Sequence, residues 1–92
     1  MVKLKVFGTL RQYIPAKQVE MEVRDGDTVR DALVRLAGDH GALGERILDG
    51  EGNLQKAINV LVNGRSIHFL DGLDTTIQEG DELAIFPAVG GG

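Results

Sequence analysis

Hydrophobic and polar residues alternate along four segments of the chain, and this period of two predicts β-strands. The four segments are residues 1–7, 18–23, 57–62 and 82–89. A fifth, shorter strand is expected at 65–69, because Asn63-Gly64 is a strong signal for a tight hairpin turn. The pattern therefore predicts about five strands, arranged as two hairpins and a final single strand.

Between the second and third strands the spacing changes to that of an amphipathic helix. Hydrophobic residues recur on one helical face at Val29, Ala32, Leu33, Leu36 and Ala37. Thr28 is the expected N-cap, and Asp31 three residues later would complete a capping box. Gly38 and Gly41 are expected to end this helix.

The remaining segments connect these elements. A further helical turn is expected at 43–48, with Leu43 and Ile47 pointing inward, and residues 8–17 and 70–79 are predicted as loops. The second loop would be anchored by Leu73 and Ile77. A mixed sheet of about five strands covered on one face by one main helix is an α+β architecture. This element order is similar to that of the ubiquitin-like β-grasp, in which the first and last strands lie side by side and parallel in the middle.

Length and composition narrow the class of protein. A chain of 92 residues predicts one domain, and 42% hydrophobic with 26% charged residues is typical of a globular protein. The net charge of −4 argues against nucleic-acid binding, and the absence of cysteine excludes disulfides and thiolate sites. No hydrophobic run is long enough for a membrane span and no signal-peptide pattern begins the chain, so a cytoplasmic location without membrane association is expected.

Residues that carry catalysis or bind metals do not form a recognisable set. His40 and His68 lack partners at metal-ligand spacing, and Ser66 lies outside any nucleophile motif. The sequence also has no glycine-rich phosphate loop. We therefore expect neither an enzyme, nor a metal site, nor a bound cofactor.

The C-terminal glycines are the most unusual feature. Of 13 glycines, Gly90, Gly91 and Gly92 directly follow the last predicted strand, so the chain divides into a domain at 1–89 and a flexible tail at 90–92. A glycine tail is slender and flexible enough to enter a narrow channel. It would present the Gly92 carboxylate, which becomes reactive only when activated, for example by adenylation. The alternative interpretation is a disordered stub without function.

The stretch EGDELAIFPAVGGG, residues 79–92, resembles the C-terminal end of the ubiquitin-like sulfur carrier family. That family includes the molybdopterin synthase small subunit and the sulfur carriers of thiamine and cysteine biosynthesis. The shared features are the Gly80-Asp81 turn, Phe86-Pro87 and Gly91-Gly92. VKLKVFGTLRQY at 2–13 and INVLVNG at 58–64 are similar to the same family, whereas Gly90 replaces its frequent alanine or threonine.

The resemblance implies that a ubiquitin-activating-like adenylyltransferase uses ATP to adenylate Gly92. A sulfur donor would then form a thiocarboxylate, and a partner synthase would take the sulfur, while the free carrier stays monomeric. Carriers that serve cysteine-forming synthases are the most similar, molybdopterin synthase follows, and the length disfavours thiamine carriers. The alternatives are a ubiquitin-like modifier joined to target lysines through Gly92, and a plain interaction domain.

The alternation also predicts a surface for these partners. Phe7, Leu61 and Phe86 are expected on the face of the sheet opposite the helix, on strands that neighbour one another in a β-grasp. Arg11 would contribute at the rim of this surface, and Val89 is also expected to bind the partners.

Overall fold

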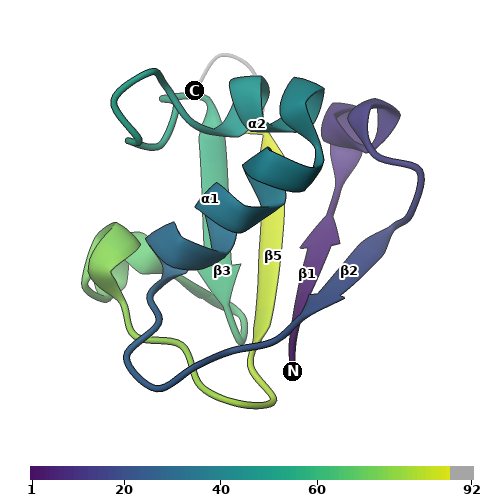
Figure 1. The fold of residues 1–92 in the computed structure, drawn as a ribbon. Coiled ribbons are helices and arrows are strands. Elements are labelled where there is room, and N and C mark those ends of the chain that lie inside the picture. Colours follow the sequence, from purple (N-terminus) through teal and green to yellow (C-terminus); the bar gives the residue numbers. More distant parts are fainter. Residues whose placement is uncertain (88–92) are drawn as a thin grey trace.

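A computed structural model describes residues 1–87 of the chain. Five strands form one sheet: β1 (Val2–Val6), β2 (Gln18–Met21), β3 (Ile58–Val62), β4 (Arg65–Ser66) and β5 (Glu82–Pro87). Two α-helices, α1 (Val29–Asp39) and α2 (Gly41–Ile47), lie over one face of this sheet (Figure 1). Three short 3₁₀ helices connect the larger elements: η1 (Gly8–Tyr13), η2 (Ile67–Phe69) and η3 (Gly72–Asp74).

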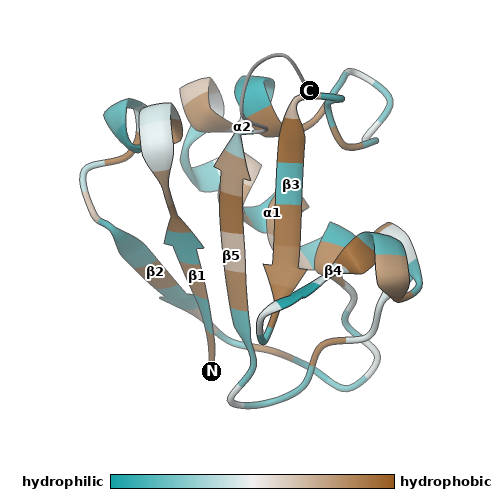
Figure 2. Cartoon of the chain, turned by 180° about the vertical axis from the view of Figure 1, so that it is seen from behind, coloured by the Kyte–Doolittle hydropathy of each residue, from teal (hydrophilic) through white to brown (hydrophobic). Residues whose placement is uncertain are grey.

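The strand order β2-β1-β5-β3-β4 places the first and last strands side by side in the middle of the sheet. β1 and β5 run parallel, while the β1–β2, β3–β5 and β3–β4 pairs are antiparallel. The predicted α+β class, the five-stranded mixed sheet and the parallel central pair are thereby confirmed. The helix-covered face and the opposite, open face are seen from the two sides in Figures 1 and 2.

The core lies between the sheet and the helices. Each central strand buries alternate residues, so that Leu83 and Ile85 of β5 and Val60 of β3 are at most 1% exposed. The predicted inward residues of the second helical segment, Leu43 and Ile47, are buried as well. Ile77 is buried and Leu73 packs against the core, as expected for anchors of the loop before β5.

Local signals set the start of α1 and the tight turn of the second hairpin. The Asp31 N–H donates to Thr28 Oγ1 at 3.3 Å and the Thr28 N–H donates to Asp31 Oδ2 at 2.9 Å, which is the predicted capping box. Asn63 and Gly64 have φ values of 50° and 85°. Two successive residues with positive φ are typical of a type I′ turn, and the predicted tight hairpin turn is thereby confirmed.

The expected end of the first helix was wrong. Gly38 lies inside α1, and Gly41 begins α2 instead of ending α1. A glycine cap requires a left-handed backbone, and neither glycine has a positive φ. The chain turns at His40, with φ −136° and ψ 78°, and the His40 N–H donates to the Leu36 carbonyl at 2.9 Å.

The return strand predicted at 65–69 was also too long. β4 ends at Ser66 because the chain curls into η2, where the Ser66 hydroxyl accepts from the His68 N–H at 3.2 Å. This curl buries Ile67 and leaves Phe69 85% exposed. The two predicted loops contain η1 and η3, and the strand expected at 18–23 ends at Met21. Within residues 1–87, no helix is long and apolar enough to cross a membrane.

Candidate docking surface and tail exit

Three hydrophobic residues predicted to face outward meet on the open face of the sheet. In the strand register Ala84 lies between Lys5 of β1 and Leu61 of β3. Phe7 directly follows β1, and Phe86 lies near the end of β5. Their ring centroids are 6.4 Å apart, with an edge-to-face angle of 81°. Phe7 is 44% exposed, which is unusual for an aromatic side chain in a small globule.

These side chains line a shallow apolar hollow, which we call the open-face patch. Its lining residues are Phe7, Gly8, Leu61, Ala84, Phe86 and Pro87. Ala84 has a small side chain, so a hollow remains among the larger side chains of Phe7, Leu61 and Phe86. Figure 2 looks onto this side of the sheet, where β3 and β5 are largely hydrophobic and β1 and β2 more hydrophilic.

Cationic side chains flank the open-face patch next to Phe7. Arg11 on η1, Lys5 and Lys17 line a second hollow together with Phe7. Lys5 pairs with Glu82 on the neighbouring strand, with Nζ and Oε1 2.6 Å apart. The hydrogen bond from Lys5 and the charge of Lys5 hold the pKa of Glu82 below its usual range. Arg11 and Lys17 form no ion pair with other residues in the range 1–87.

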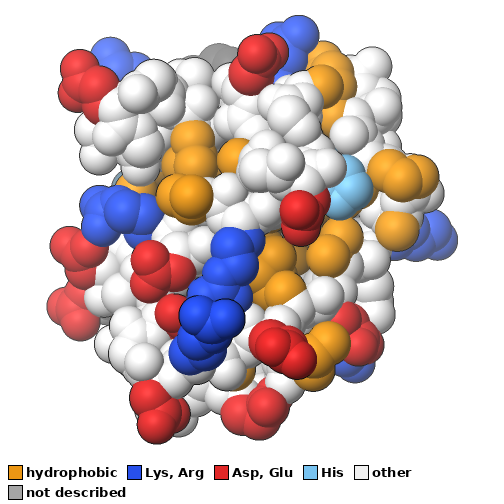
Figure 3. Space-filling view, in the orientation of Figure 1, with side chains coloured by type: hydrophobic (Ala, Val, Ile, Leu, Met, Phe, Trp, Pro, Cys, Tyr) orange, Lys and Arg blue, Asp and Glu red, His pale blue; other side chains and the backbone are white. Residues whose placement is uncertain are grey.

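The helix-covered side has a different character. Figure 3 shows acidic and basic side chains interspersed over this side, with hydrophobic side chains in small separate groups. Two of its ion pairs involve α1: Arg35 pairs with Asp27 in the turn before the helix, and Arg30 pairs with Asp74 of the distant η3. Backbone and side-chain hydrogen bonds, from Arg24 and Arg35 respectively, lower the pKa of Asp27. Because these charged side chains pair with one another, we interpret the helix-covered side as a solvated structural surface.

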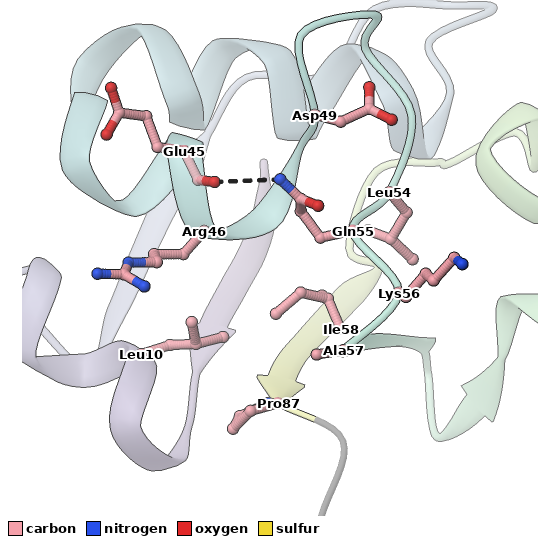
Figure 4. A pocket seen from close by; sticks show the side chains of 10 residues that line it. All are labelled: Leu10, Glu45, Arg46, Asp49, Leu54, Gln55, Lys56, Ala57, Ile58 and Pro87. Atoms are coloured by element: carbon pink, nitrogen blue, oxygen red, sulfur yellow. Dashed lines mark hydrogen bonds between the residues drawn. The ribbon is translucent and has the colours of Figure 1, made fainter. Parts of the chain in front are cut away.

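A groove opens on the other side of Pro87, between η1, α2 and the segment that leads into β3 (Figure 4). Its lining residues are Leu10, Glu45, Arg46, Asp49, Leu54, Gln55, Lys56, Ala57, Ile58 and Pro87. The Gln55 amide donates to the Glu45 carbonyl at 3.4 Å and to the Leu48 carbonyl at 3.3 Å, which ties this segment to α2. Pro87 therefore stands between the groove and the open-face patch.

The sequence indicated Phe7, Arg11, Leu61 and Phe86. The structure brings Phe7, Leu61 and Phe86 together in the open-face patch and places Arg11 in the neighbouring hollow beside Phe7. The sequence did not indicate Gly8, Ala84 or Pro87 as parts of this surface. The outward position of Ala84 follows from the same alternation and was available as a signal. Val89 and the tail residues Gly90, Gly91 and Gly92 lie outside the described residues. No cluster of three or more acidic or histidine side chains suited to a metal occurs in the described part of the chain.

A model of the ThiS family matches residues 4–92, which is nearly the whole chain. The chain belongs to the ThiS family. Two relatives illustrate its range. Small archaeal modifier protein 3 of Haloferax volcanii is 35% identical over 91 residues, covering 99% of this chain and 98% of the relative. Sulfur carrier protein CysO of Mycobacterium tuberculosis is 36% identical over 69 residues, covering 73% of this chain and 74% of the relative.

Solved structures agree with this assignment. The crystal structure of SAMP1 from Haloferax volcanii matches with a TM-score of 0.85 and 38% identity, covering 99% of this chain and 98% of that chain. A chain in the crystal structure of the Amycolatopsis orientalis BexX/CysO complex matches with a TM-score of 0.83 and 32% identity, covering both chains completely. The fold is thus the ubiquitin-like β-grasp, and the predicted sulfur carrier family is confirmed. The chain is a carrier-type protein and not an enzyme.

Proposed function

We propose that this ThiS-family protein carries sulfur as a thiocarboxylate on Gly92. In the first step a Gly92 carboxylate oxygen attacks the α-phosphorus of ATP on an activating adenylyltransferase, and pyrophosphate leaves. In the second step a hydrosulfide-type donor attacks the acyl carbon, and AMP leaves. A biosynthetic synthase of the cysteine-forming or molybdopterin type then receives the sulfur. ATP is bound by the activating enzyme, and the carrier itself needs no cofactor.

One observation carries this proposal: the open-face patch lies at the end of β5, the strand that leads into the glycine tail. Phe7, Leu61 and Phe86 surround Ala84 within one hollow, and Phe86 and Pro87 are the last described residues before the tail. A partner that covers an apolar patch at this position would receive the tail next to its own contact surface. The relative CysO is named a sulfur carrier, and one similar structure contains CysO with BexX.

A second candidate function is a ubiquitin-like protein modifier, joined to target lysines through Gly92. The observation that favours it is the similarity to the small archaeal modifier proteins, which extends over 99% of this chain. Both functions would begin with the same acyl adenylate, so they differ only in the nucleophile that attacks it. Sulfide yields a thiocarboxylate, whereas a lysine amine yields an isopeptide bond.

The test is an intact-mass measurement after incubation with ATP, an activating enzyme and sulfide. The carrier function predicts the mass gain of one oxygen replaced by sulfur, and the modifier function predicts high-mass conjugates in lysate. Deletion of Gly91 and Gly92 should abolish either product and leave the thermal melt unchanged, because the described core does not include these residues. Full product formation by the deletion variant would contradict the assignment of the reaction to Gly92.

A further inference from the structure

Among the described residues, Pro87 forms no ladder hydrogen bond with either of the strands that flank β5. In the parallel ladder the Lys3 N–H donates to the Asp81 carbonyl at 3.0 Å and the Phe7 N–H donates to the Ile85 carbonyl at 2.9 Å. The next bond of this ladder would come from the nitrogen of residue 87 to the Phe7 carbonyl. Proline has no N–H, so this bond is missing.

On the β3 side, Pro87 occupies a position that forms no ladder bond. The Asn63 N–H donates to the Glu82 carbonyl at 2.8 Å, which makes this a hydrogen-bonded pair. Hydrogen-bonded pairs alternate along an antiparallel ladder. In the register of β3 and β5, Asn59–Phe86 is therefore the last hydrogen-bonded pair within the described residues, and Ile58–Pro87 is a non-hydrogen-bonded pair. The Ile58 N–H accordingly donates elsewhere, to the Gln55 carbonyl at 3.1 Å.

Packing thus contributes to holding Pro87, and the proline ring lies against Gly8. Gly8 has a φ of 63°, which L side chains rarely adopt. A Cβ on Gly8 would lie 3.1 Å from both Cγ and Cδ of Pro87, closer than nearly all real contacts of this kind. The proline ring therefore rests directly against the bare backbone at the start of η1.

We propose that Gly8 is a positioning residue for the tail: it seats the Pro87 ring and thereby holds the last described residue of β5, the strand that precedes the tail in the sequence. Pro87 stands between the open-face patch and the groove of Figure 4, so its seat fixes the chain at the edge of the proposed docking surface. If the seat is lost, a partner must order Pro87 when it binds the tail. Ordering one more backbone residue on binding reduces the equilibrium constant for binding of the tail by a factor of about five to thirty.

The test is Gly8→Ala, and the chain offers a close control in Gly72→Ala. Gly72 begins η3 as Gly8 begins η1, and its φ of 60° nearly equals that of Gly8. No atom lies within 4 Å of a Cβ built on Gly72. The two variants therefore share the backbone strain, and only Gly8→Ala adds the collision with Pro87.

The first readout does not depend on the proposed function. We expect hydrogen exchange of the Phe86 amide, measured by NMR, to be about fivefold to thirtyfold faster in Gly8→Ala than in Gly72→Ala, with similar thermal melts. In a Pro87→Ala background, where the ring is absent, Gly8→Ala should no longer differ from Gly72→Ala. Equal exchange in the two single variants, or a difference that persists without the ring, would overturn the positioning role.

The second readout rests on the proposed function. We expect kcat/KM for adenylation of the tail to fall about fivefold to thirtyfold in Gly8→Ala and less than twofold in Gly72→Ala. Because Gly8 also lines the open-face patch, chains that lack Gly91 and Gly92 report the effect of Gly8→Ala on docking alone. A fall in kcat/KM no larger than the fall in their affinity for the activating enzyme would overturn the positioning role. If the wild-type chain is not adenylated, the proposed function fails, and the exchange measurement still decides the role of Gly8. If the wild-type chain is adenylated and both variants react alike, the positioning role is wrong.

Discussion

Replacing Phe7 by alanine tests the open-face patch as the surface that the activating enzyme binds. An aromatic side chain has roughly 150–250 Å² of surface, so an exposed fraction of 44% leaves about 65–110 Å² for a partner to cover. At ~25 cal/mol per Å² this area contributes about 2 kcal/mol to the binding free energy. We therefore expect Phe7→Ala to weaken binding about thirtyfold.

Phe86 contacts Phe7 in the open-face patch, and this contact allows a second prediction, on the double variant. Edge-to-face aromatic pairs contribute about 0.5–1.5 kcal/mol beyond the area that they bury. The rings are 6.4 Å apart at 81°, so each single alanine variant also removes this pair. Because the pair exists in the free protein, the Phe7→Ala, Phe86→Ala double variant should lose less free energy of unfolding, measured in urea, than the sum of the single variants, by about 0.5–1.5 kcal/mol.

The assay is calorimetric titration of the activating enzyme with chains that lack Gly91 and Gly92, so that tail chemistry does not contribute. Two controls remove other exposed hydrophobic side chains: Phe69→Ala on η2, where the side chain is 85% exposed, and Val34→Ala on α1, where it is 50% exposed. Neither residue lines the open-face patch, and both controls should bind as wild type. Wild-type affinity of Phe7→Ala and Phe86→Ala would refute the docking surface. An equal loss in Phe69→Ala would show that general hydrophobicity, and not this surface, drives binding.

Two further predictions concern stability, and urea unfolding checks both. Gly44→Ala should destabilise the fold by about 1–3 kcal/mol, because the new Cβ would lie 2.5 Å from Ala37 Cβ across the α1–α2 contact. Gly38→Ala should instead stabilise the fold by about 0.5–1 kcal/mol, because its Cβ would enter open space and alanine favours a helix more than glycine does. Asp27 has a lowered pKa in the folded state, so its contribution is present above its ordinary pKa and is lost as the pH falls through the lowered folded-state value. Asp27→Asn should therefore unfold more easily than wild type near neutral pH and show a shallower loss of stability in acid. A parallel pH dependence of the two proteins would contradict this assignment.

The parts of the fold that the sequence predicted are those set by local pattern. Alternation identified the faces of β1, β3 and β5, and with them Phe7, Leu61 and Phe86, because a strand places successive side chains on opposite faces. The capping box at Thr28 was equally readable, since it involves only residues three positions apart. Arg11 came from the family resemblance, and the structure places it beside Phe7.

The errors arise where tertiary contacts decide. Gly38 remains helical because the backbone there stays in the α-region and the chain turns at His40. β4 stops after two residues because curling into η2 buries Ile67. The contact between Gly8 and Pro87 joins the start of η1 to the end of β5, and no local pattern connects positions so far apart in the sequence.

β5 carries the core on one face and the proposed docking surface on the other, and the alternation of its side chains keeps the two separate. Leu83 and Ile85 point into the core and are fully buried, whereas Ala84 and Phe86 belong to the open-face patch. Truncating an inward residue would leave a cavity and destabilise the fold by about 2–5 kcal/mol, while changing an outward residue alters the surface that we propose a partner covers. Because Ala84 lines the hollow, a larger side chain there would fill it without touching the core. The proposed docking surface can therefore change its shape while the same strand continues to hold the fold.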